Sequence, residues 1–509
     1  MMSRNVGWVL SGHLKYINRT VFFFVTLLSL RSTAAIRIYP APEGIIPSQS
    51  YRVQVNGESA FVYNSPIPAA FCSFDMNGPV DIIIQADRDI KWVDIRPLSA
   101  KIKATFNDST IKIHLDKPVH LSIELNGNIK NPLFIFANPF ESNIPSSIDK
   151  NVYFFKAGKT YHPGIIKLKD NQTLYIEGGA VVTAVIEAYQ AKNIRICGRG
   201  ILDGTFNNNF NDSLIKSGIF HQKEADEEKN YHRFINLVDC ENIRIEDLTM
   251  FNSTSWDVVP IHCDKVYINN IKIISDNGGD DGIDVVRCRN VLIENTFIRT
   301  KDDCIAVKAN MNYPESEGVD SVVVRRCTFW NAMWGNGLEI GFELNSSEVK
   351  NISFLDNDII HVEAGATISI HNAGTATVRN VVFENIRIED SRQKLFDFAI
   401  FRSQYSEDGT LDAAENKRLY LNGAWDGVLI VPENEKKEHA KYRGFIKNIR
   451  LKNIKIVDGA LPFSIFCGYD QKHNVSNVLI EKLFLHGQKI KDVNKAKIYI
   501  SNTSKIIIR

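Results

Sequence analysis

The sequence predicts an all-β protein, in which a small β-sandwich domain precedes a parallel β-helix. Short alternating runs of apolar and polar residues, separated by turns every 8–12 residues, predict the sandwich. A unit made of a polar pair and an alternating strand recurs through the rest of the chain, commonly every 23–31 residues, and predicts the β-helix. No helical pattern accompanies this repeat, which favours a solenoid built of strands.

The first 35 residues are expected to be a secretory signal peptide. Arg19 precedes a mainly apolar core at residues 21–30, and small residues follow at 32–35. This core is shorter than the roughly 20 residues that cross a bilayer as a helix, and no other segment is apolar enough to span one. The competing interpretation is an N-terminal anchor or a start assigned too far upstream. We therefore expect a secreted or periplasmic protein.

The balance of charges gives no reason to expect a nucleic-acid partner, because 60 Lys and Arg residues face 59 Asp and Glu residues. Eight cysteines in a secreted chain would ordinarily indicate disulfides. Five of them instead recur at intervals of 23, 25, 16 and 23 residues, in or beside strand-like segments: Cys240, Cys263, Cys288, Cys304 and Cys327. We interpret them as small apolar residues that line a repetitive core. The irregular intervals and the lack of a CxxC pair argue against zinc.

The predicted sandwich occupies residues 36–145. Runs such as YRVQVNG, VDIIIQA and KIKATFND alternate between apolar and polar residues, as strands with one buried face do. The segment holds no cluster of titratable residues that indicates chemistry. Packing and carbohydrate contact are both open roles, and a structural role is favoured.

The predicted β-helix occupies residues 146–509. Its repeats include ENIRIEDLTM, DKVYINNIKI, RNVLIENTFI and KNISFLDNDI, which begin at Glu241, Asp264, Arg289 and Lys350. Alternate side chains point inward, so each coil buries a strip of Val, Ile, Leu and Phe that only stacked neighbours can cover. Leucine-rich repeats would need a Leu/Asn consensus, and a β-propeller would need longer units. Two polar inserts, at residues 205–232 and 390–443, are expected to wall a groove or cap an end.

The candidate chemistry lies in residues 277–308, where two acidic clusters flank one strand-like segment. Asp281 and Asp302 are 21 residues apart, close to one short coil, so Asp281 and the pair Asp302 and Asp303 are expected on adjacent rungs about 4.8 Å apart. Stacked carboxylates raise the pKa of one member, which supplies a protonated acid beside an ionised base. Glycoside hydrolysis requires that pairing. The structural alternative is an Asp-Gly turn or an acidic ladder at a solenoid corner.

Two motifs in this stretch resemble glycoside hydrolase family 28, the polygalacturonase-like pectin hydrolases. Residues 280–284 read DDGID where the family carries NTDGID, and residues 302–306 read DDCIA as in the family. The segments FNSTSWDVVPIHC and GRGILDG are also similar to that family. The resemblance implies a right-handed parallel β-helix and hydrolysis by single displacement with inversion. It also implies that Asp302 is the general acid, while Asp281 and Asp303 hold and deprotonate the water.

Two departures from the family bear on the substrate. The family's GHG motif is GNG here, so Asn336 replaces a histidine, and its RIK motif falls at residues 369–371, where His371 is the remaining candidate for a cationic role. Without that Arg and Lys the site lacks the bidentate grip expected for a uronate carboxylate. The two-part layout is similar to that of family 49, the dextranase and isopullulanase group, whose substrates are neutral α-glucans.

Further residues are candidates for substrate contact. Trp256 and Trp334, with Trp330 and Tyr313, have rings that could stack on sugars, and core packing is the alternative for each. Glu339 and Glu343 follow the GNG turn and could face the groove. Asp284 is expected to brace its turn rather than react. We therefore list Asn336, His371, Trp256, Trp334 and Glu339 as substrate-binding candidates.

Three hypotheses follow for the function. The favoured one is a secreted inverting hydrolase of an α-linked polysaccharide or oligosaccharide, polygalacturonase-like or, alternatively, dextranase-like. The second is a β-helix that binds glycans without cleaving them. The third is a polysaccharide lyase, which would need a basic constellation that the sequence does not show. The favoured mechanism requires no cofactor and no metal, and the oligomeric state cannot be read from the sequence.

Overall fold

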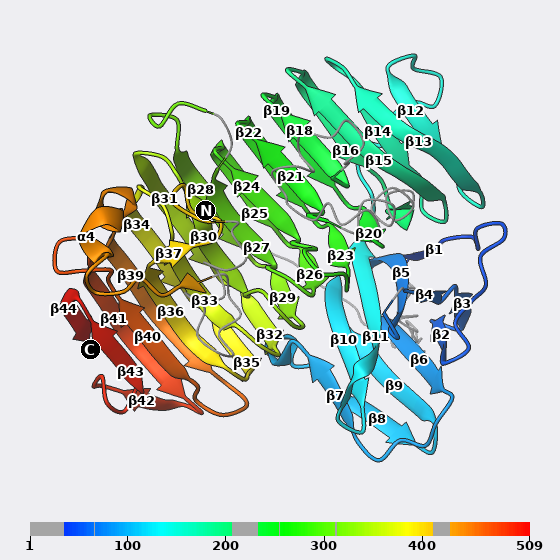
Figure 1. Cartoon of the computed structure of the whole chain (residues 1–509). Helices are drawn as coiled ribbons and strands as arrows, with labels where there is room; N and C mark the ends of the chain where they lie inside the picture. The colour runs from blue at the N-terminus through cyan, green and yellow to red at the C-terminus, as the bar shows by residue number, and fades with distance from the viewer. Residues whose placement is uncertain (1–34, 66, 206–232, 254, 311–312, 411–427) are drawn as a thin grey trace, which may run out of the picture.

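The computed structural model describes residues 35–65, 67–205, 233–253, 255–310, 313–410 and 428–509 (Figure 1). Within these residues almost all regular structure is β-strand, and a sandwich leads into a long stack of parallel strands. The predicted fold class is thereby confirmed. The proposed signal peptide lies outside the described residues except for Ala35, which begins the first strand. No helix among the described residues is long and apolar enough to cross a membrane.

The sandwich consists of two sheets whose inner faces enclose one apolar core. The first sheet contains β1 (Ala35–Ile38), β4 (Tyr63–Asn64), β5 (Ala70–Asn77), β7 (Val93–Arg96), β10 (Val119–Leu125) and β11 (Asn128–Pro139). The second contains β2 (Tyr51–Val55), β3 (Glu58–Ala60), β6 (Val80–Ala86), β8 (Ala104–Asn107) and β9 (Thr110–Leu115). Strands β2 and β6 alternate strictly between buried and exposed residues, as their sequences predict.

The chain starts to coil at β12 (Val152–Phe155), the first strand of the long parallel stack. Each coil contributes to three faces that we name A, B and C. Face A contains β12, β14 (Thr173–Ile176), β16 (Lys192–Cys197), β19 (Glu241–Glu246), β22 (Asp264–Asn269), β25 (Arg289–Glu294), β28 (Val319–Arg325), β31 (Glu348–Leu355), β34 (Thr377–Glu384), β39 (Phe445–Ile456), β41 (Val475–Leu485) and β44 (Thr503–Ile508). The repeats found in the sequence are the strands of this face.

Faces B and C complete the coils. Face B contains β13 (Thr160–Leu168), β15 (Val181–Tyr189), β17 (Ile201–Asp203), β20 (Thr249–Phe251), β23 (Lys272–Ile274), β26 (Phe297–Thr300), β29 (Thr328–Asn331), β32 (Asp358–Val362) and β35 (Arg387–Ser391). Face C contains β18 (Ile235–Val238), β21 (Val258–Ile261), β24 (Ile283–Val286), β27 (Ile305–Ala309), β30 (Leu338–Leu344), β33 (Ala366–Asn372), β36 (Lys394–Ile400), β40 (Phe463–Cys467) and β43 (Ile498–Ser501).

Short elements lie outside these faces. They are β37 (Arg402–Ser403), β38 (Val428–Leu429), β42 (Gln488–Ile490), the single-turn α4 (Lys436–His439) and the 3-10 turns η1 (Leu98–Ala100) and η2 (Ala440–Tyr442). The inserts predicted at 205–232 and 390–443 lie partly outside the described residues, so their effect on a groove stays a prediction. The domain limits 36–145 and 146–509 also stay a prediction, although β11 and β12 belong to different sheets.

The recurring Asn of each repeat has a backbone reason. Asn242, Asn290 and Asn351 adopt φ values of 57°, 54° and 57°, in the left-handed region that Asn tolerates better than most residues. Their amides also form ladders, as when Asn242 Nδ2 donates to Asn193 Oδ1 at 2.7 Å. In the coils that carry it, Asn therefore turns the chain into face A and ties one coil to the one before.

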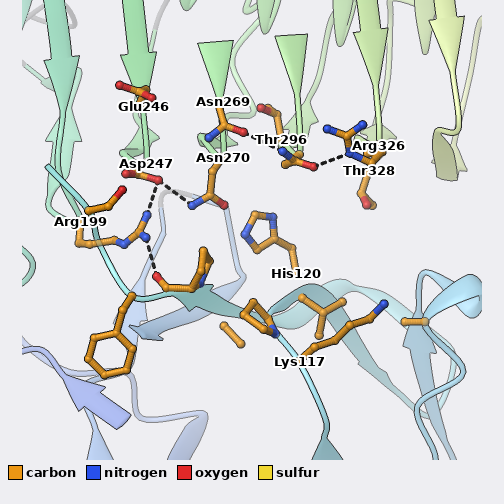
Figure 2. A pocket seen from close by; sticks show the side chains of 18 of the residues that line it. Lys117, His120, Arg199, Glu246, Asp247, Asn269, Asn270, Thr296, Arg326 and Thr328 are labelled. Carbon is orange, nitrogen blue, oxygen red and sulfur yellow. Dashed lines mark hydrogen bonds and ion pairs between the residues drawn. The ribbon is translucent and has the colours of Figure 1, made fainter. Parts of the chain in front are cut away.

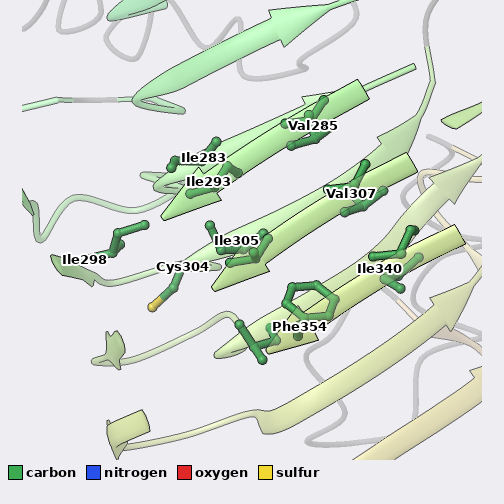
Figure 3. Close-up of a cluster of buried hydrophobic side chains, with 14 of the residues drawn as sticks. Ile283, Val285, Ile293, Ile298, Cys304, Ile305, Val307, Ile340 and Phe354 are labelled. Carbon is green, nitrogen blue, oxygen red and sulfur yellow. The ribbon is translucent and has the colours of Figure 1, made fainter. Parts of the chain in front are cut away.

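Inward side chains fill the coil beneath face C. Ile283, Ile305 and Leu338 occupy matched positions on β24, β27 and β30 and are fully buried, and Figure 3 shows the first two among their neighbours. Stacking like residues in register removes each apolar strip from water, the main stabilising effect in such a fold. The residues that alternate with them point outward, and the candidate site is built from these and from the turns before the strands.

The cysteines behave as the sequence predicts. Seven of the eight are buried, and none of the eight forms a disulfide. Cys240, Cys263 and Cys288 stack at one corner, where the backbone N–H of each of the first two faces the sulfur of the next at 3.4 and 3.3 Å.

The sandwich packs on face B. Phe134 and Phe136 of β11 contact Phe297 of β26, with ring centroids 5.1 and 5.4 Å apart. Trp330 is fully buried against Phe134. For this residue the structure shows core packing, the alternative to stacking on a sugar.

Charged contacts also join the sandwich to the β-helix. Arg96 Nη1 donates to Glu389 Oε2 at 2.6 Å, and His361 Nε2 lies 3.0 Å from Glu124 Oε1. Both contacts are buried, so the docked sandwich covers this part of face B.

Candidate active site

The candidate site lies at the corner where face B turns into face C. Gly282 N–H donates to the Asp303 carbonyl at 2.8 Å, and Cys304 N–H donates to the Asn336 carbonyl at 3.0 Å. In a parallel ladder these bonds align Asp281, Asp303 and Asn336 on three successive coils. The acidic clusters therefore stack as the 21-residue spacing predicts.

The three aspartates of the prediction come together. One carboxylate oxygen from each of Asp281, Asp302 and Asp303 lies within 4.8 Å of the other two. Asp281 is 2 % exposed and Asp303 7 %, while Asp302 is partly exposed. Burial and the charge of Asp281 raise the pKa of Asp302 to about 7. Burial, with the charges of Asp281 and Asp302, also raises the pKa of Asp303, so the cluster retains a proton near neutral pH.

Hydrogen bonds favour Asp302 as the holder of that proton. Asp303 Oδ1 accepts the backbone N–H of Asn336 at 2.6 Å and its side-chain amide at 3.0 Å. Asp302 Oδ1 accepts one bond, from the backbone N–H of Asp303 at 3.0 Å. Donors stabilise the ionised form of a carboxylate, so two donors against one direct the proton to Asp302. Asn336 thus reaches the site, but through Asp303.

Asp280 and Gly335 position the turn that carries Asp302. Asp280 Oδ1 accepts the backbone N–H groups of Lys301 and Asp302, both at 3.1 Å. A Cβ at Gly335 would lie 2.4 Å from Asp302 Oδ1 and 2.3 Å from the Asp303 nitrogen. The first glycine of the GNG motif is therefore required by close approach of the backbone, a role that the sequence did not reveal.

Lys308 is the site residue that the sequence analysis missed. Its Nζ lies 3.0 Å from Asp281 Oδ2, 3.4 Å from Asp284 Oδ1 and 4.0 Å from the centroid of the Trp256 ring. Burial alone would lower the pKa of Lys308, but Asp281, Glu343 and Asp284 raise it well above its ordinary value. The site therefore holds a fixed cation.

Two neighbours of Lys308 were considered in the sequence, and the structure places both. Asp284 does not brace the turn; it lies fully buried on β24 and faces Lys308. Trp256 is 4 % exposed and packs beneath the ammonium, so its ring has a structural contact besides the predicted contact with sugar, which stays a prediction.

A second charged row continues along face C. His371 Nδ1 lies 3.0 Å from Glu339 Oε2, and His371 Nε2 lies 3.2 Å from Asp397 Oδ2. Lys394 Nζ donates to the same oxygen of Asp397 at 2.5 Å. Burial opposes protonation of His371, but Glu339 and Asp397 raise its pKa to about 10, so the ring is a cation at neutral pH. His371 can therefore supply positive charge near the missing RIK motif, although the structure pairs it with carboxylates.

The remaining aromatic candidates differ in exposure. Trp334, on the turn before β30, is 36 % exposed and has a ring that a sugar could reach. Tyr313 stacks on His262 with centroids 4.5 Å apart, and its hydroxyl lies 3.3 Å from Asp239. Contact between Trp334 and substrate stays a prediction.

The aspartate cluster could offer one oxygen from each of three carboxylates to a divalent cation, fewer than the six or more oxygens such a cation takes. The Lys308 ammonium lies 3.0 Å from one of these oxygens and already neutralises part of the charge. The arrangement suits proton transfer to and from an oxygen atom held between carboxylates.

Comparison with known proteins agrees with this geometry. Residues 151–398 match the model of glycosyl hydrolases family 28, and this region contains the aspartate cluster, Asn336 and His371. The resemblance to family 28 is confirmed. The matched region extends over most of the coils of the β-helix and excludes the sandwich.

The relatives carry polygalacturonase names. A probable polygalacturonase of Vitis vinifera is 27 % identical over 241 residues, which is 42 % of this chain and 48 % of that protein. Endopolygalacturonase A of Aspergillus niger is 24 % identical over 263 residues, 50 % of this chain and 65 % of that protein. The chain thus spans about half to two thirds of the length of these relatives.

A solved structure extends the likeness in fold to the sandwich. Dex49A from Penicillium minioluteum aligns with a TM-score of 0.58 at 16 % identity, covering 91 % of this chain and 96 % of that one. At this identity the likeness concerns the fold, which it supports over both parts of the chain.

Proposed function

We propose that this protein is a secreted glycoside hydrolase that cleaves O-glycosidic bonds of an α-linked polysaccharide or oligosaccharide with inversion. Asp302 is the general acid, and Asp281 and Asp303 hold and deprotonate the attacking water. The observation that carries the proposal is the cluster of three carboxylates, in which Asp302 has a pKa raised to about 7. The family 28 match supports a hydrolytic glycosidase.

Each group has a task in the proposed reaction. Asp302, partly exposed and protonated, gives its proton to the leaving oxygen. Asp281, next to the Lys308 ammonium, and Asp303, bonded to Asn336, are the two carboxylates that accept hydrogen bonds from one water. Oxygens within 4.8 Å can share a water, since two hydrogen bonds of about 2.8 Å span up to about 5.6 Å.

The spacing also bears on stereochemistry. Carboxyl groups of inverting glycosidases are usually about 6.5–9.5 Å apart, and those of retaining enzymes about 5–5.5 Å. The nearest oxygens here are closer than the usual inverting distance. Inversion is proposed from the family resemblance and from the pair that can hold water, so the configuration of the first product is the decisive observation.

The substrate class follows from the cations of face C. His371 and Lys308 are both paired with carboxylates, and neither offers a planar fork to a uronate carboxylate. The two substrate classes to distinguish are therefore a uronan, cleaved as by a polygalacturonase, and a neutral α-glucan, cleaved as by a dextranase. Lys308 is fully protonated among its carboxylates, which disfavours a lyase mechanism with a lysine base.

The test is digestion of a glycan panel that includes polygalacturonate, dextran and pullulan. New reducing ends, with the inverted anomer detected first by NMR, are expected for one α-linked polymer. A non-catalytic glycan-binding protein would bind a member of the panel and release no reducing ends. An unsaturated product absorbing in the ultraviolet would indicate a lyase, and a retained anomer would exclude single displacement.

A further inference from the structure

A pocket of about 980 Å³ lies between the sandwich and the β-helix, away from the aspartate cluster (Figure 2). One wall is the corner where face A turns into face B and includes Asn269, Asn295 and Arg326. The opposite wall comes from the sandwich and includes Lys117 and His120. The proposed reaction uses none of these residues.

The pocket and the aspartate cluster lie at opposite ends of one strand. Thr296 lines the pocket, β26 follows it, and Asp302 lies two residues after β26 ends. Six residues of extended chain span roughly 20 Å. The sandwich covers face B between the two ends, so a ligand in the pocket does not reach the aspartates directly.

Hydrogen bonds fix the β-helix wall of the pocket. Asn295 Nδ2 donates to Asn269 Oδ1 at 2.7 Å, and Arg326 Nε donates to Asn295 Oδ1 at 3.0 Å. In Figure 2, Asn269 and Arg326 lie on the β-helix side of the pocket, and His120 is directed toward Asn270. Asn270, 7 % exposed, is held by its bond to Asp247 at 2.8 Å. The wall thus presents planar amide and guanidinium groups in set orientations before any ligand binds.

The charge in the pocket is nearly balanced. Five Lys and Arg side chains and four Asp and Glu side chains line it. Arg244 Nη2 lies 2.6 Å from Glu246 Oε1, and Arg326 Nη2 lies 2.5 Å from Glu294 Oε2, so these guanidinium groups are already neutralised. Burial and the charge of Lys272 lower the pKa of His120, so its ring is neutral and offers one donor and one acceptor.

These features select the chemistry of a ligand. A phosphate or uronate is held best by several unpaired cations, and the four arginines of the lining are paired with carboxylates. A neutral ligand rich in hydroxyl groups can use the fixed amides as donors and acceptors and the paired guanidinium groups as donors. The volume is at the upper end of the range for ligand pockets, large enough for more than one sugar ring.

We propose that the pocket between Arg326 and Lys117 is a second carbohydrate site, which binds an uncharged stretch of polysaccharide. The proposal rests on the proposed function for the ligand class, because a glycoside hydrolase meets polymeric glycans. The site would hold a polymer at a position remote from cleavage, and it would give the sandwich a binding role beyond packing.

The test uses the full chain carrying Asp302→Asn, in which hydrolysis is blocked, and measures binding to dextran, pullulan and polygalacturonate by affinity electrophoresis. Binding to a neutral polymer is expected. Adding Lys117→Ala and Arg326→Ala, one change on each wall, should weaken it at least tenfold. The matched control is Arg379→Ala, which removes a partly exposed arginine of face A that pairs with Glu348 outside the pocket.

Three results would overturn the second site: no neutral polymer bound, polygalacturonate alone bound, or neutral binding unchanged by the double substitution. With Asp302 restored, the double variant should lose rate on the polymer and keep the wild-type kcat/KM on a short oligosaccharide. Equal loss on both substrates would also contradict the proposal. Failure of the proposed function would look different, since no glycan would yield reducing ends whether or not it bound.

Discussion

Replacing Lys308 by Met should shift the pH dependence of catalysis. The Nζ atom lies 3.0 Å from Asp281 Oδ2 and is buried with three carboxylates. At an effective dielectric constant of 20, the attraction at 3.0 Å is about 5 kcal/mol, and desolvation offsets part of it. An opposite charge this close typically lowers a carboxyl pKa by about 1–3 units.

The Lys308 charge lowers the pKa of Asp303, against burial and the neighbouring aspartates that raise it, so loss of Lys308 should raise that pKa further. The acidic limb of the kcat/KM profile should move up by about 1–3 pH units, because the base is ionised only at higher pH. Lys308→Arg keeps the charge and is the matched control. The measurement is kcat/KM of the wild type and both variants from pH 3 to 9, with folding checked by circular dichroism. A Lys308→Met profile that superimposes on the wild-type profile would refute the role of Lys308 in lowering the pKa of Asp303.

Three further changes test other contacts. Asn336→Ala removes one donor to Asp303 and should lower kcat about tenfold, with Asn336→Gln less harmful; equal rates for wild type and Asn336→Ala would contradict this. Gly335→Ala should lower kcat at least a hundredfold, because its Cβ would collide with Asp302, and an active variant would show that the turn can shift. His361 has a raised pKa, so its bonds to Glu124 and Asp390 stabilise the fold below pH about 6.5, and this stability is lost as pH rises through the folded-state pKa. The difference in thermal midpoint between wild type and His361→Gln should shrink toward high pH. A difference that does not depend on pH would contradict stabilisation by protonated His361.

The repeated strands were predictable because the same short pattern of residues recurs in successive coils. An Asn in the left-handed region, followed by alternating apolar residues, specifies a turn and an inward strip without reference to distant chain. The stacking of Asp281 with Asp303 followed from the coil length alone. These features are local or strictly periodic, so they are visible in a single sequence.

Contacts between distant positions were not predictable in the same way. Lys308 reads as an ordinary polar residue of an alternating strand, and its importance depends on register, which aligns it with Val286 and points it toward Asp281. The contact of Arg96 with Glu389 joins residues 293 positions apart. Asp284 and Lys308 both alternate outward on neighbouring strands, which favours their pairing, but the turn motif suggested that Asp284 braces the turn.

The most direct measurement is the hydrolytic rate of Asp302→Asn on the polymer that the glycan panel identifies. Loss of the proton donor should lower kcat by about 10²–10⁴, with unchanged folding. Asp276→Asn is the matched control, because Asp276 lies on the same side of the coil and pairs with Arg299 at 2.6 Å without joining the aspartate cluster. A large loss confined to Asp302→Asn is the predicted result, and a full rate in that variant would contradict catalysis by the three aspartates.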